Sequence, residues 1–153
     1  MKTLLLLSLC GFIGFFSVNW EVNNTEVKQQ NIMENMKLKI TFEDTELSAV
    51  LYDNATTRDF ISLLPITTEL EDYASNEKIF YPERKLKSEG AHSGYKPSKG
   101  DITYYAPWGD VAIFYKDFGH ANGLISLGKI DNNGIEKLKE VGEVPVTFEL
   151  VQD

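Results

Sequence analysis

The side chains that could support catalysis in this chain are two histidines and scattered carboxylates. His92 and His120 lie in sequence rich in glycine and serine, and neither has a second ligand at a metal-binding spacing such as His-x-x-x-His. A metal could therefore bind only through residues distant in sequence, and we expect no metal site. His120 has Asp110 and Asp117 nearby, but the Gly-x-Ser-x-Gly turn of many hydrolases is absent. Hydrolysis is the least favoured chemistry.

Phosphate-binding patterns are also missing. Neither Gly-x-Gly-x-x-Gly nor Gly-x-x-x-x-Gly-Lys occurs, so we expect no bound nucleotide and no other cofactor. The 153 residues carry 15 Lys and Arg against 23 Asp and Glu, a formal charge of −8, whereas nucleic-acid binding requires clustered positive charge. We therefore predict that nucleic acid is not a partner.

Aromatic side chains are the better candidates for a functional site. Ligand clefts usually combine aromatic and apolar walls with a few polar groups. We predict a groove for a peptide or small molecule, and the expected lining residues are Tyr81, Tyr105, Trp108, Phe114 and His120. The alternative is that these rings belong to the core or to cross-strand pairs. Phe114 fits this alternative best, whereas both interpretations stay open for Trp108, which lies beside a turn.

The element that carries most of these rings is a hairpin at residues 100–115. Runs of β-branched and aromatic residues at 102–105 and 111–115 flank a turn at 106–110. Further strand patterns occur at residues 37–42, 45–52, 66–73, 78–81, 124–130 and 145–151. Short helices are predicted at 56–64 and 131–141, and residues 82–99 form a long loop without a clear period.

Strands outnumber helices in this pattern and follow one another in hairpins. We therefore predict one mostly β domain over residues 36–153, a closed, mainly antiparallel barrel of eight strands with two short helices over its ends.

The N-terminal region has the pattern of a targeting signal rather than of a part of the folded domain. Residues 1–18 place an apolar run after Lys2, as in a secretory leader, although a poor cleavage site leaves an uncleaved membrane anchor as the alternative. Residues 7–10 resemble a lipoprotein box, which makes Cys10 a candidate for lipidation. The polar residues 19–35 are expected to form a tether. The protein should thus be exported to the cell envelope and touch a membrane only through its N-terminus.

Several segments resemble the small bacterial cyclophilin-like domain family. They include Ala-Pro-Trp-Gly at 106–109 with its flanks, together with residues 51–60, 71–73, 100–101 and 113–115. The resemblance covers about residues 37–152 and implies an eight-stranded β-barrel capped by two helices. It implies no settled activity. Some relatives are joined to flavodoxin-like domains, so a flavodoxin-like redox partner is one hypothesis.

True cyclophilins are peptidyl-prolyl isomerases, and the resemblance raises that activity as a second hypothesis. Residues 79–84, Ile-Phe-Tyr-Pro-Glu-Arg, are a loose counterpart of the cyclophilin Phe-His-Arg strand, but no Gln-Gly-Gly follows. In a weak or specialised isomerase Arg84 would act as electrophile, with Trp108 and Phe114 lining the proline pocket. Arg84 would then have to lie within roughly 6 Å of an aromatic cleft. The favoured prediction is a non-catalytic binding module.

Overall fold

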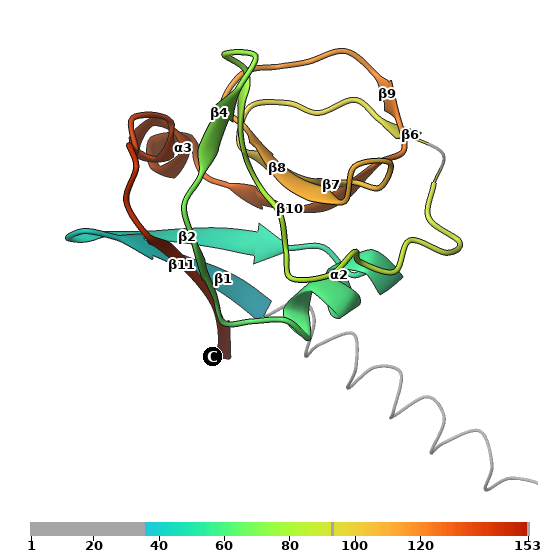
Figure 1. Cartoon of the computed structure of the whole chain (residues 1–153), viewed down its shortest axis with the longest axis horizontal. Coiled ribbons are helices and arrows are strands. Elements are labelled where there is room, and N and C mark those ends of the chain that lie inside the picture. The colour runs from blue at the N-terminus through green and yellow to red at the C-terminus, as the bar shows by residue number, and fades with distance from the viewer. Residues whose placement is uncertain (1–35, 93, 153) are drawn as a thin grey trace, which may run out of the picture.

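The structure is a computed structural model, and it describes residues 36–92 and 94–152. The predicted leader, the tether and Cys10 lie outside these residues. In chain order the strands are β1 (Met36–Phe42), β2 (Thr45–Leu51), β3 (Ile66–Thr68), β4 (Glu71–Tyr73), β5 (Glu77–Phe80), β6 (Gly94–Tyr95), β7 (Asp101–Tyr105), β8 (Asp110–Phe114), β9 (Ala121–Asn122), β10 (Leu124–Ile130) and β11 (Val146–Gln152), and the helices are α2 (Ala55–Ile61) and α3 (Asn132–Lys139) (Figure 1). No helix of this described part is both long enough and apolar enough to cross a membrane.

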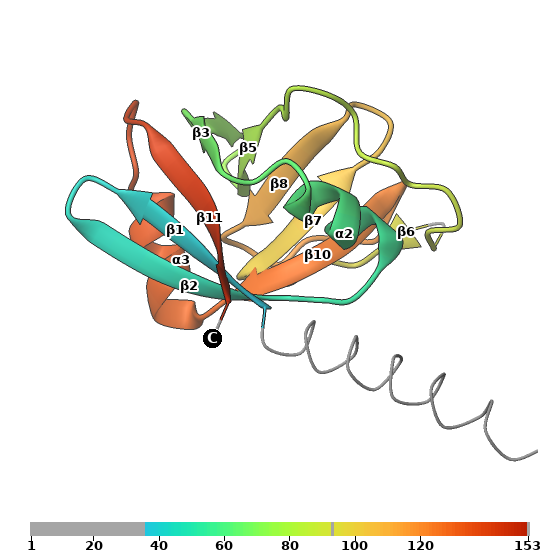
Figure 2. The ribbon, with the colours of Figure 1, turned by 90° about the horizontal axis from the view of Figure 1, so that it is seen from below.

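Nine strands form one sheet in the order β3-β11-β1-β2-β10-β7-β8-β5-β4, and all of its pairings are antiparallel. The sheet curves into an open half-barrel (Figure 2). The mostly β, antiparallel prediction with two helices is confirmed. The prediction of a closed barrel of eight strands is not.

The two edge strands of the sheet, β3 and β4, come from one segment of the chain that is interrupted between them. They pair with different neighbours and not with each other, so the sheet stays open. Residues 66–73 were predicted as a single strand, but β3 pairs with β11 and β4 pairs with β5, at opposite edges of the sheet. Between them Leu70 is buried in the core, so the chain leaves the extended ladder at this point. Residues 66–73 thus link the two edges without a continuous row of hydrogen bonds.

The core lies on the concave face of the half-barrel and follows the period of two expected for strands. In β1 the residues Leu38, Ile40 and Phe42 are buried and alternate with less buried neighbours. Phe80 of β5 stacks on Phe148 of β11 with ring centroids 4.9 Å apart, which joins the two sides of the half-barrel through the core.

The two helices lie at opposite ends of the half-barrel (Figures 1 and 2). Asn54 caps α2 by accepting a hydrogen bond from the Thr57 amide at 2.8 Å, so the helix begins before the predicted Thr56. Asp131 caps α3 in the same way, accepting from the Gly134 amide, and the buried Ile135 and Leu138 face the core.

A buried carboxylate at the start of β7 helps to hold the predicted loop at 82–99 to the sheet. Asp101, 1% exposed, accepts hydrogen bonds from the Tyr95 hydroxyl at 2.8 Å and from the Ser98 amide at 2.8 Å. Its other oxygen pairs with Lys129 at 2.7 Å. The loop also contains the short strand β6, which pairs with β9 and was not predicted.

Candidate functional site

Several strands of the sheet bury side chains on both faces. On the face opposite the core, Ile79 of β5 lies beside Ala112 of β8 in the register, and Glu77 lies beside Phe114. Ile79, Ala112 and Phe114 form a second, smaller buried cluster with Leu124 of β10. This convex side therefore has its own apolar patch, which we call the outer cluster.

A pocket of about 200 Å³ opens over the outer cluster, and aromatic rings form its walls. Trp108, in the turn between β7 and β8, lies edge-on to Tyr105 with centroids 5.4 Å apart and to Tyr73 with centroids 5.6 Å apart. Phe114 and Phe118 form a tilted pair at 5.9 Å on the same pocket. We call this the aromatic pocket.

Two carboxylates, Glu77 and Asp110, line the aromatic pocket. Burial, helped by the charge of Asp110, raises the pKa of Glu77 to about 7. Burial also raises the pKa of Asp110, although its own backbone amide opposes the shift. Asp110 is 2% exposed, and its Oδ1 has no hydrogen-bond partner in the described part of the chain. No Lys, Arg or His of that part lines the pocket.

The structure brings together three of the predicted groove residues, Tyr105, Trp108 and Phe114. Phe114 is both a buried residue and a groove residue. It is 3% exposed and belongs to the outer cluster, and it also lines the pocket. Trp108 is 50% exposed. His120 is exposed and does not line the pocket; its ring packs against the backbone of Gly94 instead.

Tyr81 also lies outside the pocket lining, but it belongs to the same face. It follows β5 at the next alternate position after Glu77 and Ile79, and it is 54% exposed. Partial desolvation of its hydroxyl and the charges of Asp110 and Glu71 raise its pKa. Tyr81 therefore lies at the rim of the acidic, aromatic surface.

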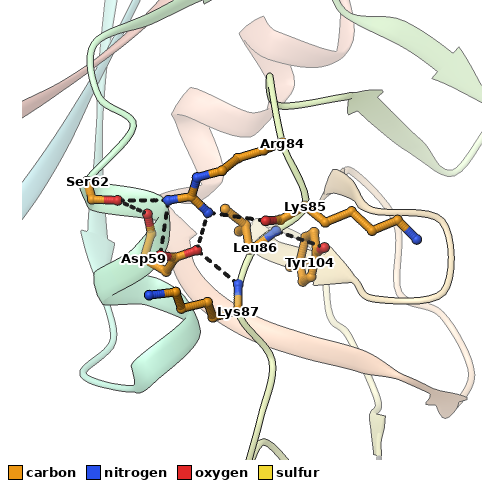
Figure 3. A network of polar contacts seen from close by, with 7 residues as sticks. All are labelled: Asp59, Ser62, Arg84, Lys85, Leu86, Lys87 and Tyr104. Carbon is orange, nitrogen blue, oxygen red and sulfur yellow. Dashed lines mark hydrogen bonds and ion pairs between the residues drawn. The ribbon is translucent and has the colours of Figure 1, made fainter.

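Arg84 does not line the pocket and is held by a polar network with Asp59, Ser62 and the 85–87 segment (Figure 3). Its Nη1 donates to Oδ2 of Asp59 at 2.6 Å and its Nη2 donates to Oδ1 at 3.1 Å. Asp59 also accepts from the Lys87 amide at 2.9 Å, and Arg84 reaches Ser62 at 3.2 Å. The bidentate bond from Arg84 lowers the pKa of Asp59. The network ties α2 to the loop.

Three larger hollows of the described surface, of about 680, 540 and 480 Å³, lack a buried carboxylate oxygen without a partner. The one of about 680 Å³ contains Lys78, which is already paired with Asp72 and the Val141 carbonyl. The one of about 480 Å³ lies beside the start of α2 and residues 89–95. No group of three or more His, Cys, Asp and Glu is placed to hold a metal ion among the described residues.

A family model matches residues 40–149 of the chain and describes the cyclophilin-like family. The chain belongs to this family. This cyclophilin-like domain is also similar to the solution structure of a hypothetical protein from Archaeoglobus fulgidus, at 24% identity and a TM-score of 0.58, over 76% of this chain and 95% of that one. That likeness supports the fold alone. No curated protein matches the chain.

The position of Arg84 in this cyclophilin-like domain bears on the isomerase hypothesis. An electrophile must face the substrate, but Arg84 does not line the aromatic pocket and makes a bidentate bond with Asp59. No contact of Arg84 in Figure 3 thus favours isomerase chemistry, and that activity stays a prediction from the resemblance.

The sequence prediction missed four aromatic or acidic residues of the pocket lining, Tyr73, Glu77, Asp110 and Phe118. A signal existed for the first three, because alternate residues of paired strands share a face. Given the hairpin register Tyr73↔Glu77, both side chains point outward together. Phe118 lies in a glycine-rich connection without any period, so no sequence pattern places it over the sheet.

We expect Arg84→Ala to lower the free energy of unfolding by more than Arg58→Ala, because the Asp59 side chain, 9% exposed, loses a bidentate, charged hydrogen-bond donor. Arg58→Ala is the matched control, since Arg58 forms an ion pair with Asp53 that is exposed on both sides. That pair should contribute less than about 1 kcal/mol. Urea unfolding of both variants tests the difference, and equal losses would show that the Asp59 network does not clamp the loop.

Proposed function

We propose that this cyclophilin-like domain is a non-enzymatic binding module that holds a peptide or a small molecule in the aromatic pocket. The observation that supports the proposal is that exposed aromatic rings cluster around this one pocket. Trp108, Tyr73 and Phe118 are 50%, 41% and 46% exposed, and all three line the same pocket above a buried apolar floor. Exposed apolar groups that gather in one place mark binding surfaces, whereas scattered ones do not.

The proposal includes an exported protein in the cell envelope. Its support is the pattern of Lys2 followed by an apolar run in residues 1–18, together with Cys10 as a lipidation candidate. Contact with a membrane would then be made by the N-terminus, and the binding domain would follow the polar residues 19–35. A flavodoxin-like redox partner rests on the family resemblance alone.

Fluorescence of Trp108 tests the binding function. The chain has two tryptophans, so a full-length Trp20→Phe variant leaves Trp108 as the single reporter. We expect a saturable change of emission with at least one of a set of short peptides that carry Pro, Phe, Lys or Glu at a central position.

The Ala112→Leu variant tests whether the ligand binds in the pocket, because Ala112 is 2% exposed and lines it. A larger side chain there should fill the cavity and weaken the saturable response by about tenfold or more, which corresponds to roughly 1.4 kcal/mol. A response that persists unchanged would place binding elsewhere, and a purely linear response to every peptide would contradict the proposal.

A further inference from the structure

We propose that the aromatic pocket binds a protonated primary amine, with the ammonium group against Asp110 and Glu77 and the apolar stem against the aromatic rings. This inference rests on the proposed binding function and names the chemical class of the ligand. A lysine side chain or a small alkylamine has this chemistry.

One oxygen of the most buried carboxylate in the pocket has no hydrogen-bond donor among the described residues. Asp110 is 2% exposed, and the Oδ1 atom is without a partner among the described residues. Asp110 alternates along β8 with Ala112 and Phe114, which also line the pocket, so its side chain lies on the pocket side of the strand. Buried carboxylate oxygens are normally hydrogen-bonded, and no residue of the described part supplies an N–H donor to this one.

The rings around this carboxylate suit a positive charge. Cations are attracted to aromatic faces within about 6 Å of the ring centroid, and tryptophan is the strongest partner. Trp108 has two tyrosine rings, Tyr73 and Tyr105, with centroids 5.6 and 5.4 Å from its own. A small cation in the pocket that these three rings line would be near several rings at once.

Other ligand classes fit the same surface less well. An anion would meet Glu77 and Asp110 without any Lys, Arg or His in the described lining to balance them. A neutral proline ring would leave Oδ1 of Asp110 unpaired, and a quaternary ammonium ion has no N–H to donate to it. The volume of about 200 Å³ is below that of typical pockets for drug-sized ligands, so a group the size of one side chain is expected.

Binding should also depend on pH, because Glu77 holds a proton up to a pKa of about 7 and an incoming ammonium group would displace it. The titratable groups facing Glu77 are Asp110 on β8, Tyr73 on β4 and Tyr105 on β7, with Tyr115 also in electrostatic contact. Glu71 and Tyr81 lie farther along the same face. Deprotonation strengthens binding, so affinity should rise roughly tenfold from pH 5.5 to pH 8.

The test titrates the full-length Trp20→Phe chain with four probes of similar size: n-butylammonium, n-butanol, butyrate and tetramethylammonium. Emission of Trp108 reports binding, and backbone amide shifts of Glu77 and Ala112 locate it. We expect n-butylammonium to bind at least tenfold more tightly than each of the other three at pH 8. Asp110→Asn should remove most of this preference, and Glu77→Gln should remove the pH dependence.

Glu149→Gln is the matched control, because it deletes one negative charge at an exposed ion pair with Lys39 on another part of the sheet. It should leave both the preference and the pH dependence unchanged. Equal binding of n-butanol and n-butylammonium would overturn the amine proposal while supporting an apolar binding site. Absence of saturable binding by all four probes and by the peptides would overturn the binding function itself.

Discussion

Asp101→Ala is expected to lower the free energy of unfolding by about 3 kcal/mol. The carboxylate is 1% exposed and accepts hydrogen bonds from the Tyr95 hydroxyl and the Ser98 amide, while Lys129 pairs with its other oxygen. Removing it leaves several donors without their acceptor at once, and each buried donor so deprived costs about 1–3 kcal/mol. The Lys129 side chain is 39% exposed and can be solvated, which keeps the loss below that of a fully buried ion pair.

Chemical denaturation measures this loss, with Glu149→Ala as the control. The Lys39–Glu149 pair is also an ion pair between sheet residues, but both side chains are about one third exposed or more, so its removal should cost less than about 1 kcal/mol. Hydrogen exchange should speed up selectively at residues 94–99 in the Asp101 variant. Similar losses in the two variants would mean that Asp101 does not hold the loop to the sheet.

The second large effect is expected from Glu77→Gln, and it should be visible only at neutral to alkaline pH. The pKa of Glu77 is about 7 in the folded protein, against an ordinary value of 4.5 for a glutamate. A raised acid pKa means that the folded state binds more protons, so the contribution of Glu77 to stability is complete below about pH 4.5 and is lost as the pH rises to about 7. The ionised carboxylate then destabilises the fold.

The pKa difference corresponds to at most about 3 kcal/mol, and partial exposure of Glu77 to solvent reduces it to roughly 1–3 kcal/mol. Glu77→Gln should therefore be more stable than the natural chain at pH 8 and nearly equal to it at pH 4.5. Thermal unfolding across this range measures the difference, with Glu149→Gln as control. Parallel pH profiles for the natural chain and Glu77→Gln would show that Glu77 is not desolvated by the pocket.

These effects connect the stability of the domain to its proposed function. Binding sites often retain groups that the fold alone would not favour. Glu77 and Asp110 are such groups, because burial penalises their charged forms and no basic side chain of the described pocket lining offsets it. A bound ammonium ion would relieve both carboxylates. The amine proposal therefore also predicts stabilisation of the domain by its ligand at pH 8.

Local sequence patterns were sufficient for the longer strands and for the two helices of the described part. The hairpin predicted at 100–115 is formed by β7 and β8, and its aromatic and β-branched runs match the strand bounds closely. The helix predicted at 131–141 corresponds to α3, whose N-cap Asp131 and buried Ile135 and Leu138 are local features that a sequence can show. The family resemblance extended these segments to a cyclophilin-like fold, and the family match confirms it.

These local patterns could not predict which strands distant in sequence pair with each other. The sequence of residues 66–73 alternates weakly and could not show that its two halves pair with different edges of the sheet, which opens the barrel. Arg84 was a candidate electrophile because of its place in a loose motif. Its bidentate partner, Asp59, is 25 residues away and becomes a neighbour only when α2 packs against the loop.

The sequence by itself determined the strand-rich class of the domain, the hairpin with its aromatic residues and the acidic net charge, because each depends on residue type and short spacing. Only the tertiary structure decided that Trp108 meets Tyr73, that the rings surround Glu77 and Asp110, and that Arg84 and His120 lie outside the pocket. The physical reason is that the pocket combines β4, β5, β7, β8, β10 and the 116–123 connection. Its carboxylates acquire raised pKa values only when sheet packing removes water around them.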